Sequence, residues 1–272
     1  MKYSIITINY NNRDGLHKTI ESVVNQSYKD FEYIVIDGGS TDGSREVIEE
    51  FADHIDYWVS EPDKGIYNAM NKGIRAAHGE YLNFMNSGDF FFNGNVLNDI
   101  LPYLDKDIVT GKSINEDFSA RPFHVSANPT MIQFYKNTVD HQASFIARKL
   151  FENNLYDENY KIVSDWKFYI ESIIFRNCSF SLIPVTIAIF QNGGISETQK
   201  ILNEEERRDV LDKLFPPRVI KDFERFLDKE SPMLDLIPQF NRTYRLQEYI
   251  VSTVKVILKI YSLFKRTNKA TS

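Results

Sequence analysis

The sequence predicts an α/β protein with a mostly parallel central sheet, and two observations support this prediction. Short apolar runs rich in β-branched and aromatic residues alternate with amphipathic segments in the N-terminal part. Strands that alternate with helices in this way form parallel β-α-β units with right-handed crossovers. With 272 residues, 42% of them hydrophobic, the chain can form one large α/β domain with a helical appendage.

The composition narrows the class of protein. The formal net charge of −6 argues against nucleic acid as the main partner, because phosphate backbones require a basic footprint. Cys178 is the only cysteine, so no intrachain disulfide can form and we expect a reducing, cytoplasmic compartment. We find no signal-peptide pattern and no apolar run of transmembrane length.

The first strand and helix follow from an apolar run that ends in a polar turn. Tyr3–Tyr10 is β-branched and mostly apolar, which favours a strand. Asn12 or Asp14 can cap the helix predicted over Gly15–Asn25. A dinucleotide-binding fold would need glycines in this turn so that the backbone could approach a pyrophosphate, and the turn contains none.

The second strand–helix pair contains a polar, glycine-rich turn. A strand is predicted over Phe31–Asp37, followed by a helix that ends near Phe51. Asp42 stands where an N-cap residue of that helix belongs, so we interpret it as structural. Tyr57–Val59 is predicted as a short third strand.

The stretch Ser60–Asp89 provides the next helix and strand. Apolar residues at helical spacing predict an amphipathic helix over Ile66–Ala77, which Gly79 ends. Tyr81–Met85 is short and largely apolar, as expected for a strand covered on both faces. It continues into Asn86–Asp89, so that a carboxylate follows the carboxyl end of the strand, where open α/β sheets bind ligands.

The pattern is less regular beyond this point. We expect a helix over Asn93–Leu104, a strand over Asp107–Thr110, and then a strand pair with loops as far as Asn128. Phe180–Phe190 is predicted as a strand, and Pro184 favours an edge position for it.

The residues after Thr198 have a helical and charged composition, which defines an appendage over 199–272. Helices are expected over Asn203–Leu214 and then as far as about Asp228. A last helix, Arg242–Arg266, combines a wide apolar face with basic charges. It fits a peripheral helix on the inner, anionic face of a membrane, or a face packed on the catalytic domain or on a second subunit of a homodimer.

Taken together, these motifs resemble glycosyltransferase family 2, enzymes with the A-type glycosyltransferase fold. The resemblance is clearest over Ser60–Asp89 and extends loosely to about Ser196. It implies one Rossmann-like nucleotide-diphospho-sugar transferase domain over 1–198, with a donor-binding half at 1–110 and an acceptor half at 111–198. The implied reaction moves a hexosyl-type sugar from a nucleotide-diphosphate sugar to a saccharide or lipid-linked acceptor in cell-surface polysaccharide synthesis.

The resemblance also assigns donor-binding residues. In the family, polar residues that end the first two strands hold the nucleotide, and here these are Thr7, Asn9 and Asp37, with Asp37 accepting hydrogen bonds from the base. Lys64 and Gly65 lie in a turn before a helix, where a cation can meet a diphosphate.

The Asp-x-Asp element of the family falls on Asn86–Asp89, which implies donor contacts from Asn86 and Ser87 and a metal bound by Asp89. Asn86 replaces the usual leading aspartate and removes one charge. Like charges about 4 Å apart repel by about 4 kcal/mol at an effective dielectric of about 20, and Mn²⁺ or Mg²⁺ would relieve this repulsion. The carboxylates expected around the diphosphate are Asp37, Glu61, Asp63 and Asp89.

Asp165 begins an aromatic-rich helix at the place where the family has its general base. A nucleoside diphosphate leaves as a stabilised anion, so only the acceptor hydroxyl needs deprotonation, whereas a glycosidase needs two carboxylates. A single base opposite the leaving group implies inversion at the anomeric carbon. The alternative is that Asp165 only caps its helix.

Two further motifs resemble elements near the acceptor and the donor. His141 and Gln142 match the family's His-Gln element, although a lone histidine is more often structural. Gly193 and Gly194 permit a mobile loop over the donor, or a simple hairpin. Other functions also stay open, namely a catalytically silent nucleotide-sugar-binding or scaffold protein and a metal-dependent phosphohydrolase.

Overall fold

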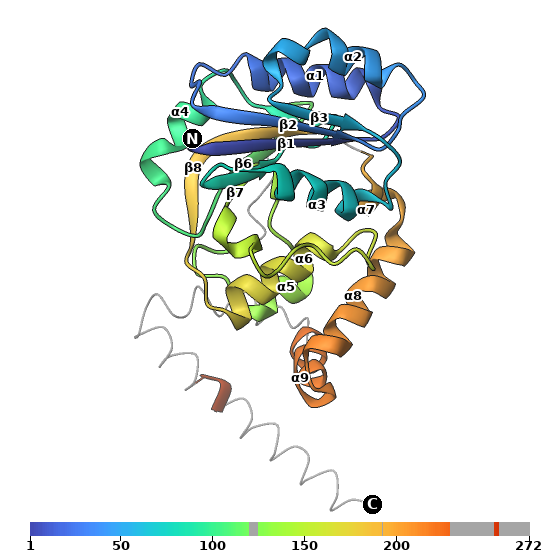
Figure 1. Ribbon diagram of the computed structural model, residues 1–272. Coiled ribbons are helices and arrows are strands. Elements are labelled where there is room, and N and C mark those ends of the chain that lie inside the picture. The colour runs from blue at the N-terminus through green and yellow to red at the C-terminus, as the bar shows by residue number, and fades with distance from the viewer. Residues whose placement is uncertain (120–124, 192, 229–252, 256–272) are drawn as a thin grey trace, which may run out of the picture. The chain divides into compact units, whose positions relative to one another are not determined.

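The computed structural model describes residues 1–119, 125–191, 193–228 and 253–255 of the chain. It divides into two compact units, Met1–Leu214 and Phe215–Ser272. The first unit contains the whole described sheet, whose strand order is β3-β2-β1-β4-β7-β6-β8-β5 (Figure 1).

The four N-terminal strands form the parallel part of the sheet. They are β1 (Tyr3–Asn9), β2 (Phe31–Asp37), β3 (Tyr57–Ser60) and β4 (Tyr81–Phe84). β1 lies between β2 and β4, and β2 also pairs with β3. The register places Asn9 beside Asp37 and Asp37 beside Ser60, so the polar residues that end three strands form one row.

The helices that connect these strands are α1 (Arg13–Val24), α2 (Ser44–Glu50) and α3 (Ile66–Ala76). The Asn12 side chain accepts from Gly15 N at 3.3 Å and caps α1. The Asp42 carboxylate accepts from Arg13 N at 2.9 Å and from Ser44 N at 3.1 Å, which joins the starts of α1 and α2. The N-cap residue of α2 is Gly43, so Asp42 lies one position before the cap that the sequence predicted, although its carboxylate does bond the backbone there.

The second half of the sheet is mixed. Its strands are β5 (Phe90–Phe91), β6 (Ile108–Asn115), β7 (Ser144–Ala147) and β8 (Phe180–Phe190). β7 is antiparallel to both β4 and β6, β5 is antiparallel to β8, and β6 and β8 are parallel. The α/β class is confirmed, with the purely parallel arrangement confined to the N-terminal strands.

Two local predictions for this half were wrong, and a third falls partly outside the described residues. β8 is not the edge strand, because the two-residue β5 lies outside it and pairs with Ala188 and Ile189. Pro184 is accommodated by a register shift between β6 and β8. The helix expected over Asn93–Leu104 is only α4 (Val96–Ile100) with a 3₁₀ turn. The strand pair expected over 111–128 includes residues 120–124, which lie outside the described residues, and the described part contains the end of β6.

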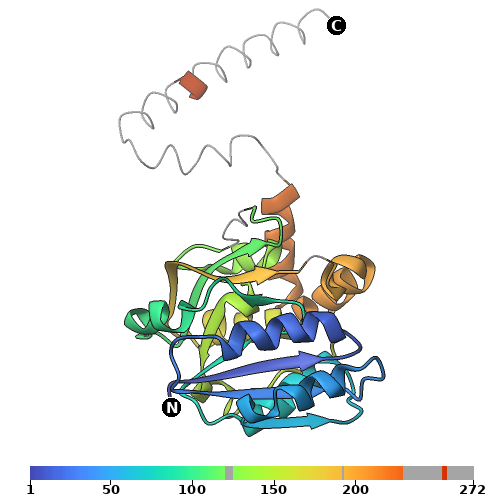
Figure 2. The same cartoon turned by 90° about the horizontal axis from the view of Figure 1, so that it is seen from above.

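Two layers of helices enclose the parallel strands. α1 and α2 cover one face and α3 covers the other (Figure 1), and α1 runs alongside the strands in the view from above (Figure 2). Because side chains alternate along a strand, Ile5 joins the core cluster that includes Leu16 of α1, whereas Ile6 meets Gly73 of α3.

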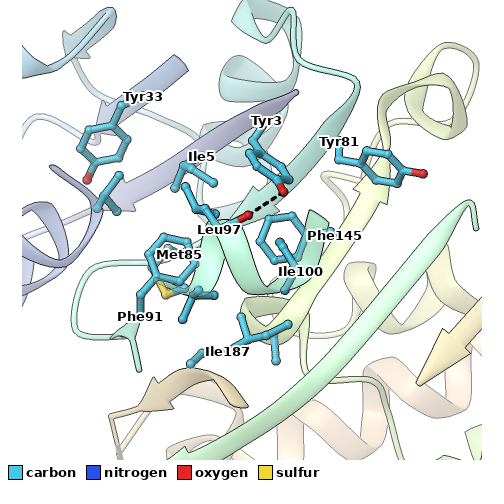
Figure 3. Close-up of a cluster of buried hydrophobic side chains, with 14 of the residues drawn as sticks. Tyr3, Ile5, Tyr33, Tyr81, Met85, Phe91, Leu97, Ile100, Phe145 and Ile187 are labelled. Carbon is cyan, nitrogen blue, oxygen red and sulfur yellow. Dashed lines mark hydrogen bonds between the residues drawn. The ribbon is translucent and has the colours of Figure 1, made fainter. Parts of the chain in front are cut away.

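The core on the α1 face continues into the second half of the sheet. Figure 3 shows Tyr3, Met85, Phe145 and Ile187 in one buried cluster. The Tyr3 hydroxyl donates to the Leu97 carbonyl at 2.8 Å, which satisfies a polar atom inside this cluster. The shared core joins the predicted donor and acceptor halves.

The remaining helices that the structure describes come after β6 in the sequence. They are α5 (Met131–Lys136), α6 (Ser164–Tyr169), which continues as a π-helical turn over Ile170–Phe175, α7 (Ile195–Thr198), α8 (Lys200–Leu214) and, in the second unit, α9 (Pro217–Asp228). Apart from residues 253–255, the last helix predicted over Arg242–Arg266 lies outside the described residues. Among the helices that the structure describes, none is long and apolar enough to cross a membrane.

We predict that Gly73→Ala destabilises the protein. A Cβ at this position would lie 2.5 Å from Cγ2 of Ile6, so α3 would have to move away from the sheet. Overpacking of this kind costs about 1–3 kcal/mol, which exceeds the helix propensity gained. Urea unfolding would measure the change, and Gly73→Ala should cost less when Ile6→Ala has removed the clashing group. A more stable single variant would contradict the prediction.

Candidate functional site

The carboxyl ends of the parallel strands provide most of the predicted donor residues. In both views the ends of β1 and β2 lie on the side of the unit where α7 and α8 follow β8 (Figures 1 and 2). This is the edge at which open α/β sheets bind ligands.

Asp37 is the centre of a hydrogen-bond network at this edge and is 0% exposed. Its Oδ1 accepts from Asn9 Nδ2 at 2.7 Å and from Ser40 Oγ at 2.5 Å. Its Oδ2 accepts from Ser40 N at 2.9 Å and from Ser60 Oγ at 2.6 Å. Burial alone would raise the pKa of Asp37, but these donors hold it below its usual value. The carboxylate is therefore ionised and fixes the turn after β2.

The two predicted residues of β1 differ in their surroundings. Thr7 is fully buried inside the sheet, where its hydroxyl donates to Met85 O at 2.8 Å and lies 2.9 Å from the Tyr33 hydroxyl. Its side chain thus fixes the end of β4. Asn9 lies at the edge, and its Oδ1 is buried without a hydrogen-bond partner in the described structure. Such an atom is available to a ligand.

The turn that carries Lys64 and Gly65 lies beside the Asp37 turn. Asp63 Oδ2 would be 2.6 Å from a Cβ on Gly38, so the close approach depends on the glycine. Asp63 Oδ1 accepts from Gly65 N at 2.8 Å, and Lys64 and Gly65 are exposed. The structure thus brings the predicted cation to the donor edge.

The loop after β4 is clamped to β1 and α1. Ser87 N donates to Ile8 O at 3.0 Å, and the Asn12 side chain donates to Ser87 O at 3.1 Å. The Thr19 hydroxyl donates to Asp89 O at 2.7 Å. These contacts hold the predicted Asp-x-Asp element next to the ends of the parallel strands.

Asp89 is 7% exposed and contacts the end of β8. Its Oδ1 accepts from Gln191 N at 2.9 Å. The glycines predicted as a lid, Gly193 and Gly194, follow directly, and Gly194 precedes the first turn of α7. The C-terminal end of β8 therefore lies at the Asp89 loop, more than a hundred residues away in sequence.

Asp165 is the most constrained carboxylate of the acceptor half and is 8% exposed. The Tyr67 hydroxyl lies 2.8 Å from Oδ1, and His141 Nδ1 lies 3.4 Å from Oδ2. On its other side, His141 Nε2 lies 3.0 Å from Asn86 Nδ2. A continuous chain of contacts, Tyr67–Asp165–His141–Asn86, thus joins the predicted base to the donor loop.

This chain sets the protonation of its members. Burial would raise the pKa of Asp165, but hydrogen bonds from His141 and Tyr67 hold it below its usual value. Burial would lower the pKa of His141, but Asp165 and then Asp89 raise it. Burial and the Asp165 charge raise the pKa of Tyr67, which therefore stays a proton donor.

Sequence reasoning missed Tyr67. Tyr67 lies on the apolar side of the helix predicted over Ile66–Ala77, and a buried tyrosine requires a hydrogen-bond partner, which was the available signal. Gln142 is 2% exposed, and its backbone carbonyl accepts from Asn83 Nδ2 at 3.0 Å. His141 is the member of the His-Gln pair that reaches the site.

The donor set of the Asn86–Asp89 loop fits a Mn²⁺ or Mg²⁺ ion that takes most of its ligands from substrate and water. Among the described residues no group of three or more His, Cys, Asp or Glu side chains could hold a metal alone. Asp89 provides one carboxylate, and Asn86 Oδ1 is buried without a partner in the described structure. Carboxylate and amide oxygens are ligands that both ions accept.

Most of the carboxylates expected to crowd the diphosphate have partners within the chain. Glu61 forms an ion pair with Lys72 at 2.8 Å, and Asp63 accepts from the Gly65 amide. Asp37 is saturated as described above. Asp89 accepts from Gln191 N, so each of these four carboxylates has a partner within the chain, and Glu61 is the one described here with a cationic partner.

Comparison with known proteins agrees with this geometry. The family model described as "Glycosyl transferase family 2" matches residues 4–164. An uncharacterized glycosyltransferase of Mycobacterium tuberculosis is 31% identical over 226 residues, which cover 78% of this chain and 85% of the relative. A PGL/p-HBAD biosynthesis glycosyltransferase of Mycobacterium bovis is 27% identical over 205 residues, covering 72% and 79% of the two chains.

Solved structures share the fold. S. aureus TarS in complex with UDP has a TM-score of 0.60 and 19% identity, covering 74% of this chain. This chain spans less than two thirds of that structure, 63% of its length. The mannosyltransferase PcManGT from Pyrobaculum calidifontis, in complex with GDP-Man and Mn²⁺, has a TM-score of 0.62 and 14% identity, covering 94% and 80% of the two chains.

We predict that His141→Gln weakens the dependence of stability on pH. Because the folded pKa of His141 is raised, its pairing with Asp165 stabilises the fold fully below about pH 6.5, and this stabilisation is lost as the pH rises through the folded pKa. The variant should therefore lose more unfolding free energy at about pH 6 than at about pH 9. Urea titrations would measure this, with His54→Gln as an exposed control. An equal loss at both pH values would contradict it.

Proposed function

The chain belongs to glycosyltransferase family 2, and from this premise we propose that it moves one sugar from a nucleotide-diphosphate sugar to a saccharide or lipid-linked acceptor, with inversion. The observation that carries the proposal is the buried Asp165 carboxylate, which His141 connects to Asn86 in the loop of Asp89. A base that one histidine joins to the donor loop suits a single displacement. The M. bovis relative, a PGL/p-HBAD biosynthesis glycosyltransferase, supports a glycoconjugate product and a role in cell-surface polysaccharide synthesis.

The donor would lie across the ends of β1, β2 and β4. Asn9 and the Asp37 turn would contact the nucleoside, and the unpartnered Oδ1 of Asn9 offers an acceptor atom there. The diphosphate would lie between Lys64 and the Asn86–Asp89 loop. The UDP and UDP-GlcNAc complexes of TarS and the GDP-Man complex of PcManGT support a donor of this class.

A divalent cation fits the same loop. Asp89 and Asn86 Oδ1 would hold Mn²⁺ or Mg²⁺, and the bound ion would offset the charge on the departing diphosphate. The Mn²⁺ in the PcManGT complex supports this dependence. The protein itself contributes Lys64, whose ammonium group can bind a diphosphate oxygen directly, without a metal.

Asp165 would act as the general base. Its carboxylate takes the proton of the acceptor hydroxyl while that oxygen forms a bond to the anomeric carbon. The bond from the anomeric carbon to the diphosphate breaks at the same time, and the diphosphate leaves with the electron pair. Tyr67 and His141 hold the carboxylate ionised and oriented before the acceptor arrives.

Asp165→Asn should abolish transfer while it preserves donor binding. Loss of the base should lower kcat by about 10²- to 10⁴-fold, because the amide keeps the shape but takes no proton. Nucleoside diphosphate release from a panel of nucleotide sugars and saccharide acceptors would measure turnover, and calorimetry would measure donor affinity. Asp53→Asn, at an exposed site, serves as the control. An equal loss of affinity and turnover would instead assign Asp165 a structural role.

Asp89→Ala should remove the effect of metal on nucleotide binding. In the wild type we expect Mn²⁺ to strengthen UDP or GDP binding by about tenfold or more, because an ion held by Asp89 would offset the negative charge of the diphosphate. Thermal shifts with each nucleotide, with and without Mn²⁺, would measure this increment in the wild type, in Asp89→Ala and in the exposed control Asp99→Ala. Metal-dependent turnover within a few-fold of wild type in Asp89→Ala would refute the assignment.

The alternative is a catalytically silent nucleotide-sugar-binding protein, which Asn86 favours because it removes a charge from the loop. Wild-type protein that binds a nucleotide sugar but releases no nucleoside diphosphate with any acceptor would support it. Peripheral membrane contact through 242–266, and a homodimer, stay predictions. Comparing membrane-fraction recovery of the full chain with that of a chain lacking 242–272 would test the membrane contact.

A further inference from the structure

Helix α8 is fixed to the turn that precedes α6, the helix that carries Asp165. The Glu206 carboxylate, on a residue 9% exposed, accepts from Lys161 N at 2.8 Å and from Ile162 N at 2.9 Å. The sequence had placed this helix in the appendage over 199–272, whereas the structure includes it in the unit that ends at Leu214. The side chains on this face of α8 are therefore held close to the base.

The next residue of α8, Arg207, lies over Trp166. The guanidinium carbon is 4.3 Å from the ring centroid, and Arg207 Nη2 donates to Asn137 O at 3.4 Å. Trp166 is itself fixed, because its Nε1 donates to Phe134 O at 2.8 Å. Since Trp166 directly follows Asp165, this stacking holds a cation beside the predicted base.

Arg207 has hydrogen-bonding capacity that the described residues do not use. A guanidinium carries five N–H donors, and the contact with Asn137 O engages one of them. Within the described ranges no carboxylate lies within 4.0 Å of it. Burial lowers the pKa of Arg207, and the charge of Asp165 opposes this effect.

Stacking on Trp166 does not satisfy the hydrogen-bond donors of the Arg207 guanidinium. The ring face attracts the positive charge but leaves the N–H groups in the guanidinium plane without acceptors. A partly buried cation with unused donors is costly for a fold, and two oxygens of a phosphate or a carboxylate satisfy it through paired hydrogen bonds. The local chemistry therefore fits an anionic ligand.

We propose that Arg207 binds an anionic group, a phosphate or a carboxylate, on the acceptor substrate. The inference rests on the proposed function, because it takes Asp165 as the base that meets the acceptor hydroxyl. An anionic group bound by Arg207 beside Trp166 would belong to the acceptor, because Asp165 contacts the acceptor hydroxyl in the proposed reaction. The donor diphosphate already has a separate cation in Lys64, at the edge formed by β1, β2 and the Asn86–Asp89 loop. Arg207 then selects acidic acceptors over neutral saccharides.

The two tryptophans of the chain, Trp58 and Trp166, give a direct readout. Full-length protein with ¹⁵N-labelled tryptophan yields two indole signals, which Trp58→Phe assigns. Titration with inorganic phosphate, and separately with acetate, should move the Trp166 signal saturably and leave Trp58 in place. A stronger response to phosphate indicates a phosphate-bearing acceptor, and a stronger response to acetate indicates an acidic saccharide.

Arg207→Gln should weaken this response by about tenfold or more, because the charge-assisted hydrogen bonds are lost. Arg207→Lys should retain a weaker response, since it keeps the charge without the planar fork. The control Arg208→Gln removes a neighbouring cation that is paired with Asp212 at 3.1 Å, and it should respond as wild type. An unchanged Trp58 signal in each variant reports an intact fold.

The proposal is overturned if wild-type Trp166 does not respond, or if Arg207→Gln responds equally. It is also overturned if UDP or GDP moves the Trp166 signal in an Arg207-dependent manner, because the anion would then belong to the donor. No turnover is measured, so a negative result leaves the transferase assignment standing.

Discussion

A buried carboxylate imposes the main constraint on this fold. Asp165 is 8% exposed, and burying an ionised carboxylate without donors costs several kcal/mol. The donors come from Tyr67 in α3 and from His141 just before β7, so α3, β7 and α6 must meet at one point. The antiparallel placement of β7 against β4 brings His141 to the donor loop at the same time. One electrostatic requirement therefore joins the two halves of the domain.

The donor edge is rigid for a related reason. Asp37 uses both carboxylate oxygens to hold the turn after β2, and Asn12 and Thr19 hold the loop after β4. Asn12, which caps α1, and Thr19, which lies in α1, thus fix the loop that follows β4. A nucleotide that binds here meets preorganised groups and orders few new residues, which preserves binding energy for the transition state.

Local rules were sufficient for the N-terminal half and insufficient beyond it. The parallel strands, the Asn12 cap and the position of Asp37 follow from apolar runs and turn residues in adjacent sequence. The short β5, the interior position of β8 and the pairing of Tyr67 with Asp165 depend on contacts far apart in sequence. Arg207 was missed for the same reason. Its helix has an ordinary charged sequence, and only the contacts of Glu206 with the backbone of Lys161 and Ile162 place Arg207 near Asp165.

The amide at position 86 is explained by the charges around His141. Asp165 and Asp89 both raise the pKa of His141 already. An aspartate at position 86 would add a third carboxylate and would compete with Asp165 for the imidazolium. Asn86 contacts His141 through Nδ2 and carries no charge, so it does not compete with Asp165 for the imidazolium. An amide at this position would therefore remove one charge from the proposed metal site and would leave His141 paired with the proposed base, Asp165.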